Sequence, residues 1–141
     1  MDDDNSDGGG WHSPLRRIPS GDLSAETGQS AGMVRREAVS ARTVGSKRVW
    51  MGESTVAART TSQNHHHGDS ETGIYVVSGH PVFVFAEGGQ EVRLTPEPGD
   101  YIFVPPFTAH REENPSTEPA VVVLARSSQE AIVVNLEGPL L

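Results

Sequence analysis

Residues 99–114 read GDYIFVPPFTAHREEN, and this stretch decides the fold. The aromatic and β-branched run Tyr101–Val104 is typical of a strand, and a second strand is expected over 109–113. Glycine and aspartate before the first run, and prolines between the two, are turn formers. The stretch therefore predicts two short strands joined by a turn, the second of which carries His110.

The same pattern extends in both directions, from about residue 33 to the end of the chain. Short runs rich in β-branched and aromatic residues alternate with Gly, Pro, Asn, Asp or Ser. The other runs expected to form strands are Met33–Val39, 47–51, 54–61, 73–77, 82–86, 91–94, 120–125 and 131–135. No stretch has the periodicity of an amphipathic helix of three turns. Many short strands at regular spacing predict an all-β sandwich or barrel.

The first 32 residues have a different composition, rich in Asp, Ser, Gly and Pro, and their few apolar residues show no period. We expect 1–32 to form a flexible, acidic, Gly- and Ser-rich N-terminal segment. Because 141 residues correspond to one domain, we expect 33–141 to form a single barrel.

Composition excludes several classes of function. A net charge of -8 argues against binding to nucleic acid or to anionic membranes. The absence of cysteine excludes disulfides, thiolate zinc sites and a cysteine nucleophile. No apolar run approaches the ~20 residues that span a membrane, and the N-terminus is acidic where a signal peptide would be basic. We therefore expect a cytoplasmic protein without nucleic-acid or membrane partners.

Residues 65–71 read HHHGDSE and supply potential metal ligands. In a strand, His65 and His67 point to the same side, and a turn would bring the Glu71 carboxylate back toward them. With His110 from the second stretch, three imidazoles and one carboxylate suit a divalent transition metal: Fe, Mn, Ni, Cu, Co or Zn. We expect one such ion per chain.

Three alternatives remain open for these residues. His65 and His67 can be ordinary surface histidines, and His110 can be a hydrogen-bonded core residue. Asp69 competes with Glu71 for the role of carboxylate ligand. His66 is expected to point away from the ion.

Together, the two stretches resemble the paired motifs of the cupin superfamily, in the form of a small single-domain cupin. The first motif, G-x5-H-x-H-x3,4-E-x6-G, appears here as His65-x-His67-x3-Glu71, closing at Gly79. The second motif, G-x5-P-x-G-x2-H-x3-N, appears as Gly99-x5-Pro105-x-Phe107-x2-His110-x3-Asn114.

The sequence departs from these motifs at three points. Arg59 stands where the first motif begins with glycine, and Phe107 replaces the glycine of the second. Seven residues instead of six separate Glu71 from Gly79, so Glu71 is the least secure ligand.

The resemblance implies an antiparallel double-stranded β-helix, that is, a jelly-roll cupin barrel. It also implies one metal ion held by His65, His67, Glu71 and His110. Because cupins are often homodimers, it further implies a second copy of the chain as partner, with an N-terminal strand pairing across the interface.

Three further side chains are weak candidates for a catalytic role. Tyr75 and Tyr101 carry hydroxyls that need partners if buried, so one of them can face the metal or substrate. Glu112 shares strand parity with His110 and can assist an imidazole or transfer a proton. Core packing for the tyrosines and solvent exposure for Glu112 are the alternatives.

These residues indicate a mononuclear metalloenzyme acting on a small organic substrate. An oxygenase of the dioxygenase type comes first, and a metal-assisted isomerase, cyclase or lyase comes second. The alternatives are a non-catalytic small-molecule-binding protein, such as a sensor or storage protein, and a degenerate barrel that serves as an interaction protein.

Overall fold

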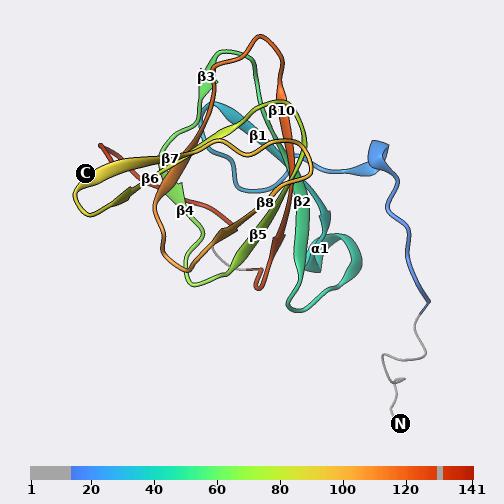
Figure 1. Ribbon diagram of the computed structural model, residues 1–141. Coiled ribbons are helices and arrows are strands. Elements are labelled where there is room, and N and C mark those ends of the chain that lie inside the picture. Colours follow the sequence, from blue (N-terminus) through green and yellow to red (C-terminus); the bar gives the residue numbers. More distant parts are fainter. Residues whose placement is uncertain (1–13, 130–131) are drawn as a thin grey trace.

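The computed structural model describes residues 14–129 and 132–141, which form two antiparallel β-sheets facing each other (Figure 1). The predicted all-β jelly-roll fold is confirmed. The predicted N-terminal segment lies in part outside the described residues, which begin at residue 14. None of the described helices is long and apolar enough to cross a membrane.

The first sheet has five strands in the order β1-β2-β10-β5-β8. Their bounds are Met33–Val39 (β1), Trp50–Val56 (β2), Ala120–Arg126 (β10), Thr72–Ser78 (β5) and Tyr101–Val104 (β8). Side chains alternate between the two faces of each strand. The inward-facing set forms one core: Trp50, Ile74, Val76, Val104, Val122 and Leu124, joined by Phe83 from the opposite sheet.

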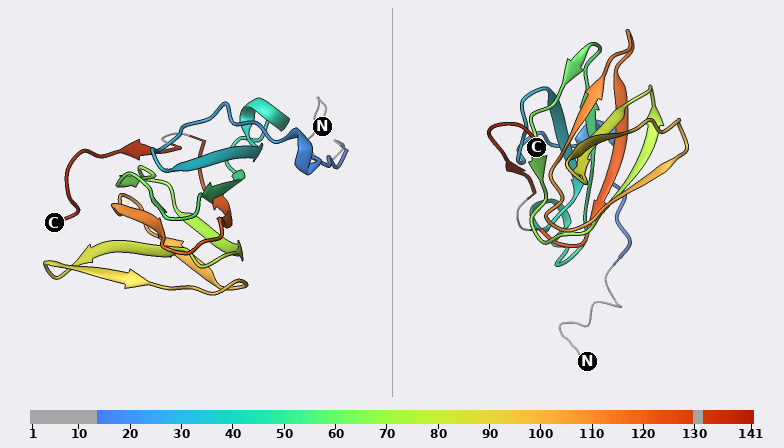
Figure 2. Two further views of the ribbon diagram at one scale, coloured as in Figure 1. Left: turned by 90° about the horizontal axis from the view of Figure 1, so that it is seen from above. Right: turned by 60° about the vertical axis from the view of Figure 1, so that its left-hand side comes forward.

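The second sheet has the order β11-β4-β9-β6-β7, and β3 also pairs with β9. Their bounds are Val134–Asn135 (β11), His65–His66 (β4), His110–Asn114 (β9), Val82–Glu87 (β6), Gln90–Leu94 (β7) and Thr60–Thr61 (β3). In Figure 2, β1 and the β6–β7 hairpin lie on opposite sides of the barrel. This sheet carries the histidines on its inner face.

The structure corrects the strand boundaries predicted around Gly52. Two strands were expected, over 47–51 and 54–61, with a break at the glycine, but β2 is continuous from Trp50 to Val56. A Cβ at Gly52 would lie 2.3 Å from the carbonyl oxygen of Arg36 and 2.8 Å from the Trp50 ring. Glycine is present here because the neighbouring backbone and the indole approach closely, and not because the strand ends.

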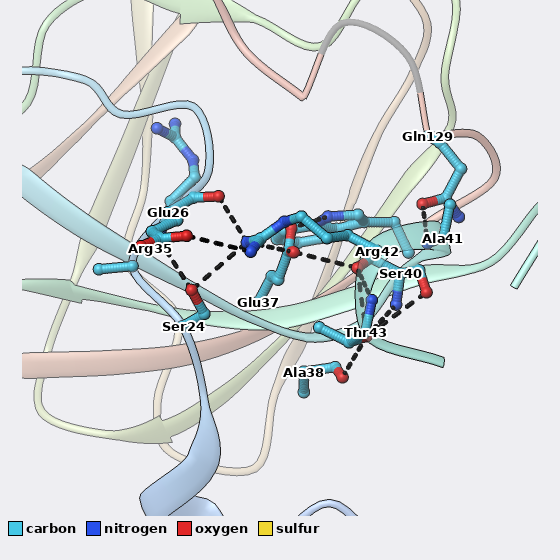
Figure 3. Close-up of polar contacts among 12 residues, drawn as sticks. Ser24, Glu26, Arg35, Glu37, Ala38, Ser40, Ala41, Arg42, Thr43 and Gln129 are labelled. Atoms are coloured by element: carbon cyan, nitrogen blue, oxygen red, sulfur yellow. Dashed lines mark hydrogen bonds and ion pairs between the residues drawn. The ribbon is translucent and has the colours of Figure 1, made fainter. Parts of the chain in front are cut away.

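The N-terminal segment is tied to β1 and to α1 (Ala41–Val44), a single helical turn that the sequence did not reveal (Figure 3). The Arg42 guanidinium donates hydrogen bonds to the Glu26 carbonyl oxygen (2.6 Å) and side chain (3.2 Å), and pairs with Glu37 at 2.6 Å. The Ser24 and Glu37 backbones form a β-bridge. From Ser24 onward, the segment is therefore bound to the barrel.

Two residues that replace motif glycines nevertheless have the backbone conformation that favours glycine. Arg59 has φ +57° and Phe107 has φ +59°, in the left-handed region that disfavours residues with a Cβ. The Phe107 amide donates to the carbonyl oxygen of Gly68 at 2.7 Å, which links the two motif turns. The turn geometry is thus kept despite the change in residue type.

Candidate metal centre

Three histidines converge inside the barrel. His65 on β4 and His110 on β9 are direct cross-strand partners, and His67 follows β4. One ring nitrogen from each lies within 4.8 Å of the other two, and the ring centroids of His65 and His110 are 4.4 Å apart. All three side chains are buried, with at most 4% of their surface exposed. These three histidines can hold a metal ion.

Each imidazole is oriented by a backbone carbonyl. The Nδ1 atoms of His65, His67 and His110 lie 2.7, 2.8 and 3.0 Å from the carbonyl oxygens of Gln63, Ile132 and Thr108. Because a carbonyl only accepts hydrogen bonds, Nδ1 carries the proton in each ring, and Nε2 keeps a lone pair for a ligand.

The environment keeps the three imidazoles neutral, as metal ligands must be. Burial is the largest cause, and it lowers the pKa of His65 to about 2, that of His67 to about 3 and that of His110 to about 4. The positive charge of Arg35 lowers all three pKa values further. The Nε2 atoms of His65 and His110 are buried without a hydrogen-bond partner among the described residues. Buried polar atoms normally have a partner. A metal cation would be a fitting partner for these nitrogen lone pairs.

Buried charged residues accompany the histidines, among them Arg35 and Glu112. Arg35 points inward from β1, where its guanidinium donates to the Ser30 hydroxyl at 3.1 Å. Burial lowers the pKa of Arg35 to about 10, so it stays protonated at neutral pH. Glu112 lies on the same face of β9 as His110 and is 1% exposed, and burial raises its pKa to about 7. The sequence suggested Glu112, but it gave no sign of Arg35.

A cavity of about 410 Å³ lies between the β6–β7 hairpin and β8, and His110 is one of its lining residues. The rest of the lining is mainly apolar and includes Phe83, Phe85, Leu94, Ile102 and Val104. A small organic molecule with an apolar body fits a cavity of this size and character.

The structure does not bring Glu71 to the histidines. Its side chain is exposed, and its backbone pairs with Ser127, whose amide donates to the Glu71 carbonyl oxygen at 3.1 Å. Along β5, Thr72, Ile74 and Val76 point inward. Because adjacent strand residues point to opposite faces, Glu71, which precedes Thr72, points outward. The ligand role predicted for Glu71 is not supported by this geometry, and it stays a prediction. Asp69, the competing carboxylate, is also exposed.

Thr72, and not Glu71, is the residue whose side chain is buried at the start of β5. It is fully buried and pairs with Arg126 of β10, whose guanidinium donates to the His67 carbonyl oxygen at 2.9 Å. Counted from His67, Thr72 satisfies the longer spacing of the first motif, with four intervening residues, and six residues then separate it from Gly79. The motif therefore places Glu71 at the position of its glutamate with the shorter spacing, and Thr72 with the longer one.

The remaining candidates lie outside the barrel interior. Tyr75 and Tyr101 lie on the outer face of the five-stranded sheet, 37% and 77% exposed, with ring centroids 4.9 Å apart and ring planes tilted by 55°. The catalytic role suggested for them stays a prediction without support from this position. His66 points away from the cluster, as expected, and its Nδ1 accepts the Gly68 amide at 2.9 Å.

Known proteins with similar structures bear on this site. Oxalate decarboxylase from Bacillus subtilis at pH 4.6 matches with a TM-score of 0.66 and 27% identity, covering 77% of this chain and 28% of that chain. A further structure, from work on the Mn(II) centres of this enzyme, matches with a TM-score of 0.67 and 24% identity, covering 80% and 30%. The present chain thus spans less than a third of that protein.

A second fold relative is similar in size. The polyketide cyclase RemF from Streptomyces resistomycificus matches with a TM-score of 0.71 and 20% identity, covering 89% of this chain and 88% of that chain. No curated protein matches at the level of sequence. The sequence profile of the cupin domain matches residues 52–126, more than half of the chain. The chain therefore belongs to the cupin family.

Proposed function

We propose that this cupin is a mononuclear metalloenzyme that acts on a small organic substrate, with an oxygenase reaction as the first candidate. The observation that carries the proposal is the convergence of three neutral imidazoles inside the barrel, one of which, His110, also lines an apolar cavity. A divalent ion held there would supply Lewis acidity or oxygen activation, since three protein ligands leave coordination positions open.

The residues of the chain have distinct roles in this proposal. His65, His67 and His110 would hold the ion through Nε2, with their rings fixed by backbone carbonyls. Apolar side chains such as Phe83 and Phe85 would orient the substrate and exclude water. Glu112, buried two residues after His110, would be available to hold a proton near the site.

Elemental analysis of untagged protein, purified without nickel chromatography, tests the metal centre. We expect about one first-row transition metal ion per chain, which is lost in His65→Ala and in His110→Ala. His66→Ala is the matched control, because this neighbouring ring points away, and it should keep the metal. A wild-type protein that neither contains nor takes up any ion of the series would refute the proposal.

An oxygen electrode separates the two reaction classes. With small organic acids, phenols and diketones as test substrates, oxygen uptake that depends on added iron or manganese would support an oxygenase. Turnover under strict anaerobiosis would instead support a metal-assisted isomerase, cyclase or lyase. A non-catalytic binding protein would retain its ligand affinity after removal of the metal.

We also propose that the chain forms a homodimer. The outer face of the five-stranded sheet exposes Tyr75, Val77, Tyr101 and Phe103, of which Tyr101 and Phe103 are 77% and 61% exposed. Exposed apolar patches of this kind are typical of association surfaces. Light scattering coupled to gel filtration measures the mass directly, and a Tyr101→Lys variant should shift it toward the monomer.

A further inference from the structure

The three imidazoles of the metal centre are not oriented in the same way. The Nδ1 atoms of His65 and His110 each lie next to a carbonyl oxygen only two residues earlier in the chain. The partner of His67 is instead the carbonyl oxygen of Ile132, 65 positions later, at 2.8 Å. The orientation of His67 therefore depends on how the C-terminal part of the chain is docked, whereas the other two orientations are local.

Ile132 belongs to the C-terminal segment 132–138, which lies along the histidine strand. In this segment, β11 pairs with β4, and the Leu136 amide donates to the Asn64 carbonyl oxygen at 2.9 Å. The side chain of Ile132 packs against the hydrophobic core. These contacts hold the Ile132 carbonyl against the imidazole of His67.

The N-terminal segment fastens this C-terminal segment to the other sheet, since β1 and β11 are the outer strands of their sheets. The Gln29 side chain exchanges two hydrogen bonds with the Arg35 backbone of β1, at 2.7 and 2.8 Å. Asn135 of β11 donates to the Gln29 carbonyl oxygen at 2.8 Å and accepts from the Ser30 hydroxyl at 2.6 Å. Figure 2 shows β11, in dark red, next to the N-terminal part of the chain, in blue. A terminal clasp thus closes this edge of the barrel, formed by residues 29–30 and 132–135.

We propose that Ile132 is a positioning residue of the metal centre, and that the terminal clasp holds its carbonyl so that Nε2 of His67 faces the ion. This inference rests on the proposed function, in which the three histidines bind a divalent ion. It adds that one of these ligands is preorganised by the two ends of the chain. A hydrogen bond to one ring nitrogen fixes the tautomer and the orientation of the ring, and loss of such a partner typically weakens metal binding about 10–100-fold.

Nitrogen-15 NMR of the full-length, metal-free protein tests the hydrogen bond, because it distinguishes the two tautomers of a neutral imidazole. In the wild type, we expect the proton on Nδ1 of all three histidines. In Ile132→Ala and in Asn135→Ala, His67 should become a mixture of tautomers, because its acceptor is no longer held in place. His65 and His110 are internal controls and should keep the proton on Nδ1, since their carbonyls are local. An equal change in all three rings would show general loosening and would overturn the inference.

Release of Co²⁺ from the loaded, full-length protein to an excess of chelator measures the consequence for the ion. Ile132→Ala should release it about tenfold faster than the wild type, and Asn135→Ala about fivefold faster. Ile132→Val, which keeps a branched side chain for the core, should restore the wild-type rate. A chain that ends at Gly138 is the matched control, because residues 139–141 make no hydrogen bond to the described part of the chain.

Both measurements must change for the inference to hold. A wild-type tautomer of His67 or a wild-type rate of release in Asn135→Ala would overturn it, even if Ile132→Ala does not fold.

The two proposals fail in different ways. If the wild type binds no Co²⁺ in stoichiometric amount, the proposed function fails and takes this inference with it. If Co²⁺ binds and is lost in His65→Ala, but the clasp variants leave His67 and the release of the ion unchanged, the metal centre stands and the role of Ile132 is wrong.

Discussion

Replacing Asn114 by aspartate should cost a large part of the protein's stability, although the two side chains have the same shape. Asn114 is 1% exposed, and its amide nitrogen lies 2.7 Å from the Glu118 carbonyl oxygen and 3.0 Å from that of Val56. Its side-chain oxygen accepts the Ser116 hydroxyl at 2.9 Å. One amide thus joins the end of β9 to the end of β2, which explains why the second motif closes with asparagine.

The magnitude follows from these contacts. In Asn114→Asp, the two N–H donors that face the carbonyl oxygens of Val56, Ala57 and Glu118 are lost, at about 1 kcal/mol each. A carboxylate oxygen then faces those carbonyls, and leaving a buried charge without a partner brings the total to about 3–5 kcal/mol. Since domains of this kind are stable by about 5–15 kcal/mol, the variant should lose about a fifth or more of its free energy of unfolding.

The cost should depend on pH in a defined direction. Burial among carbonyls raises the pKa of the new aspartate in the folded state above its unfolded value of about 3.9. The destabilisation is therefore smallest below about pH 4, where the group is protonated in both states. It grows as the pH rises from the unfolded pKa of about 3.9 to the raised folded pKa, and it levels off above that value. At low pH, the protonated acid also regains one hydrogen bond to a carbonyl oxygen.

Urea unfolding of the metal-free proteins at pH 5 and pH 7 measures this, with tryptophan fluorescence as the signal. The metal is removed because binding to the folded state would add its own stabilisation. Ser116→Ala is the control, since it removes one donor to the Asn114 oxygen and should cost about 1 kcal/mol or less. A loss below about 1 kcal/mol for Asn114→Asp, or the same loss at both pH values, would refute the reasoning.

Two further substitutions test backbone conclusions by thermal unfolding or urea titration. Arg59→Gly should stabilise the protein by about 0.5–1 kcal/mol. Glycine adopts the left-handed conformation at φ +57° without the steric cost of a Cβ, and this gain exceeds the loss from the greater entropy of the unfolded chain. Arg59→Ala, which keeps a Cβ, should bring no gain. Gly52→Ala should destabilise it by about 2 kcal/mol or more, because the Cβ would lie 2.3 Å from the Arg36 carbonyl oxygen. Gly73→Ala, where a Cβ has nothing within 4 Å, is its control.

Much of the fold was predictable because glycine, proline and serine in the turns of this chain mark where strands begin and end. The strand Tyr101–Val104 has the predicted bounds, and β1 also agrees, since both are delimited by glycine, proline or serine. The break predicted at Gly52 failed because the reason for that glycine is a contact with β1, a strand distant in sequence. The helical turn α1 is too short to show periodicity.

The site was predictable to the extent that it depends on strand parity. His65 and His67 share a face because they are two residues apart, and the second motif supplies His110 at the correct spacing. The buried position of Arg35 near the histidines was not predictable. The sequence of β1 gives no local sign that a charged residue in this strand points into the barrel. Its burial depends on β1 pairing with β2 in one particular register.

The register of the turn after His67 decides which side chain faces the barrel interior. Adjacent strand residues point to opposite faces, so the register with which the chain enters β5 determines whether Glu71 or Thr72 faces inward. In this chain the backbone of Glu71 is bound to Ser127, at 3.0 and 3.1 Å, and the register is fixed from outside the site. The Glu71 side chain is then exposed, and the buried Thr72 side chain faces inward in its place. The side chain that this turn presents to the barrel interior is therefore set by the contacts of the Glu71 backbone with Ser127.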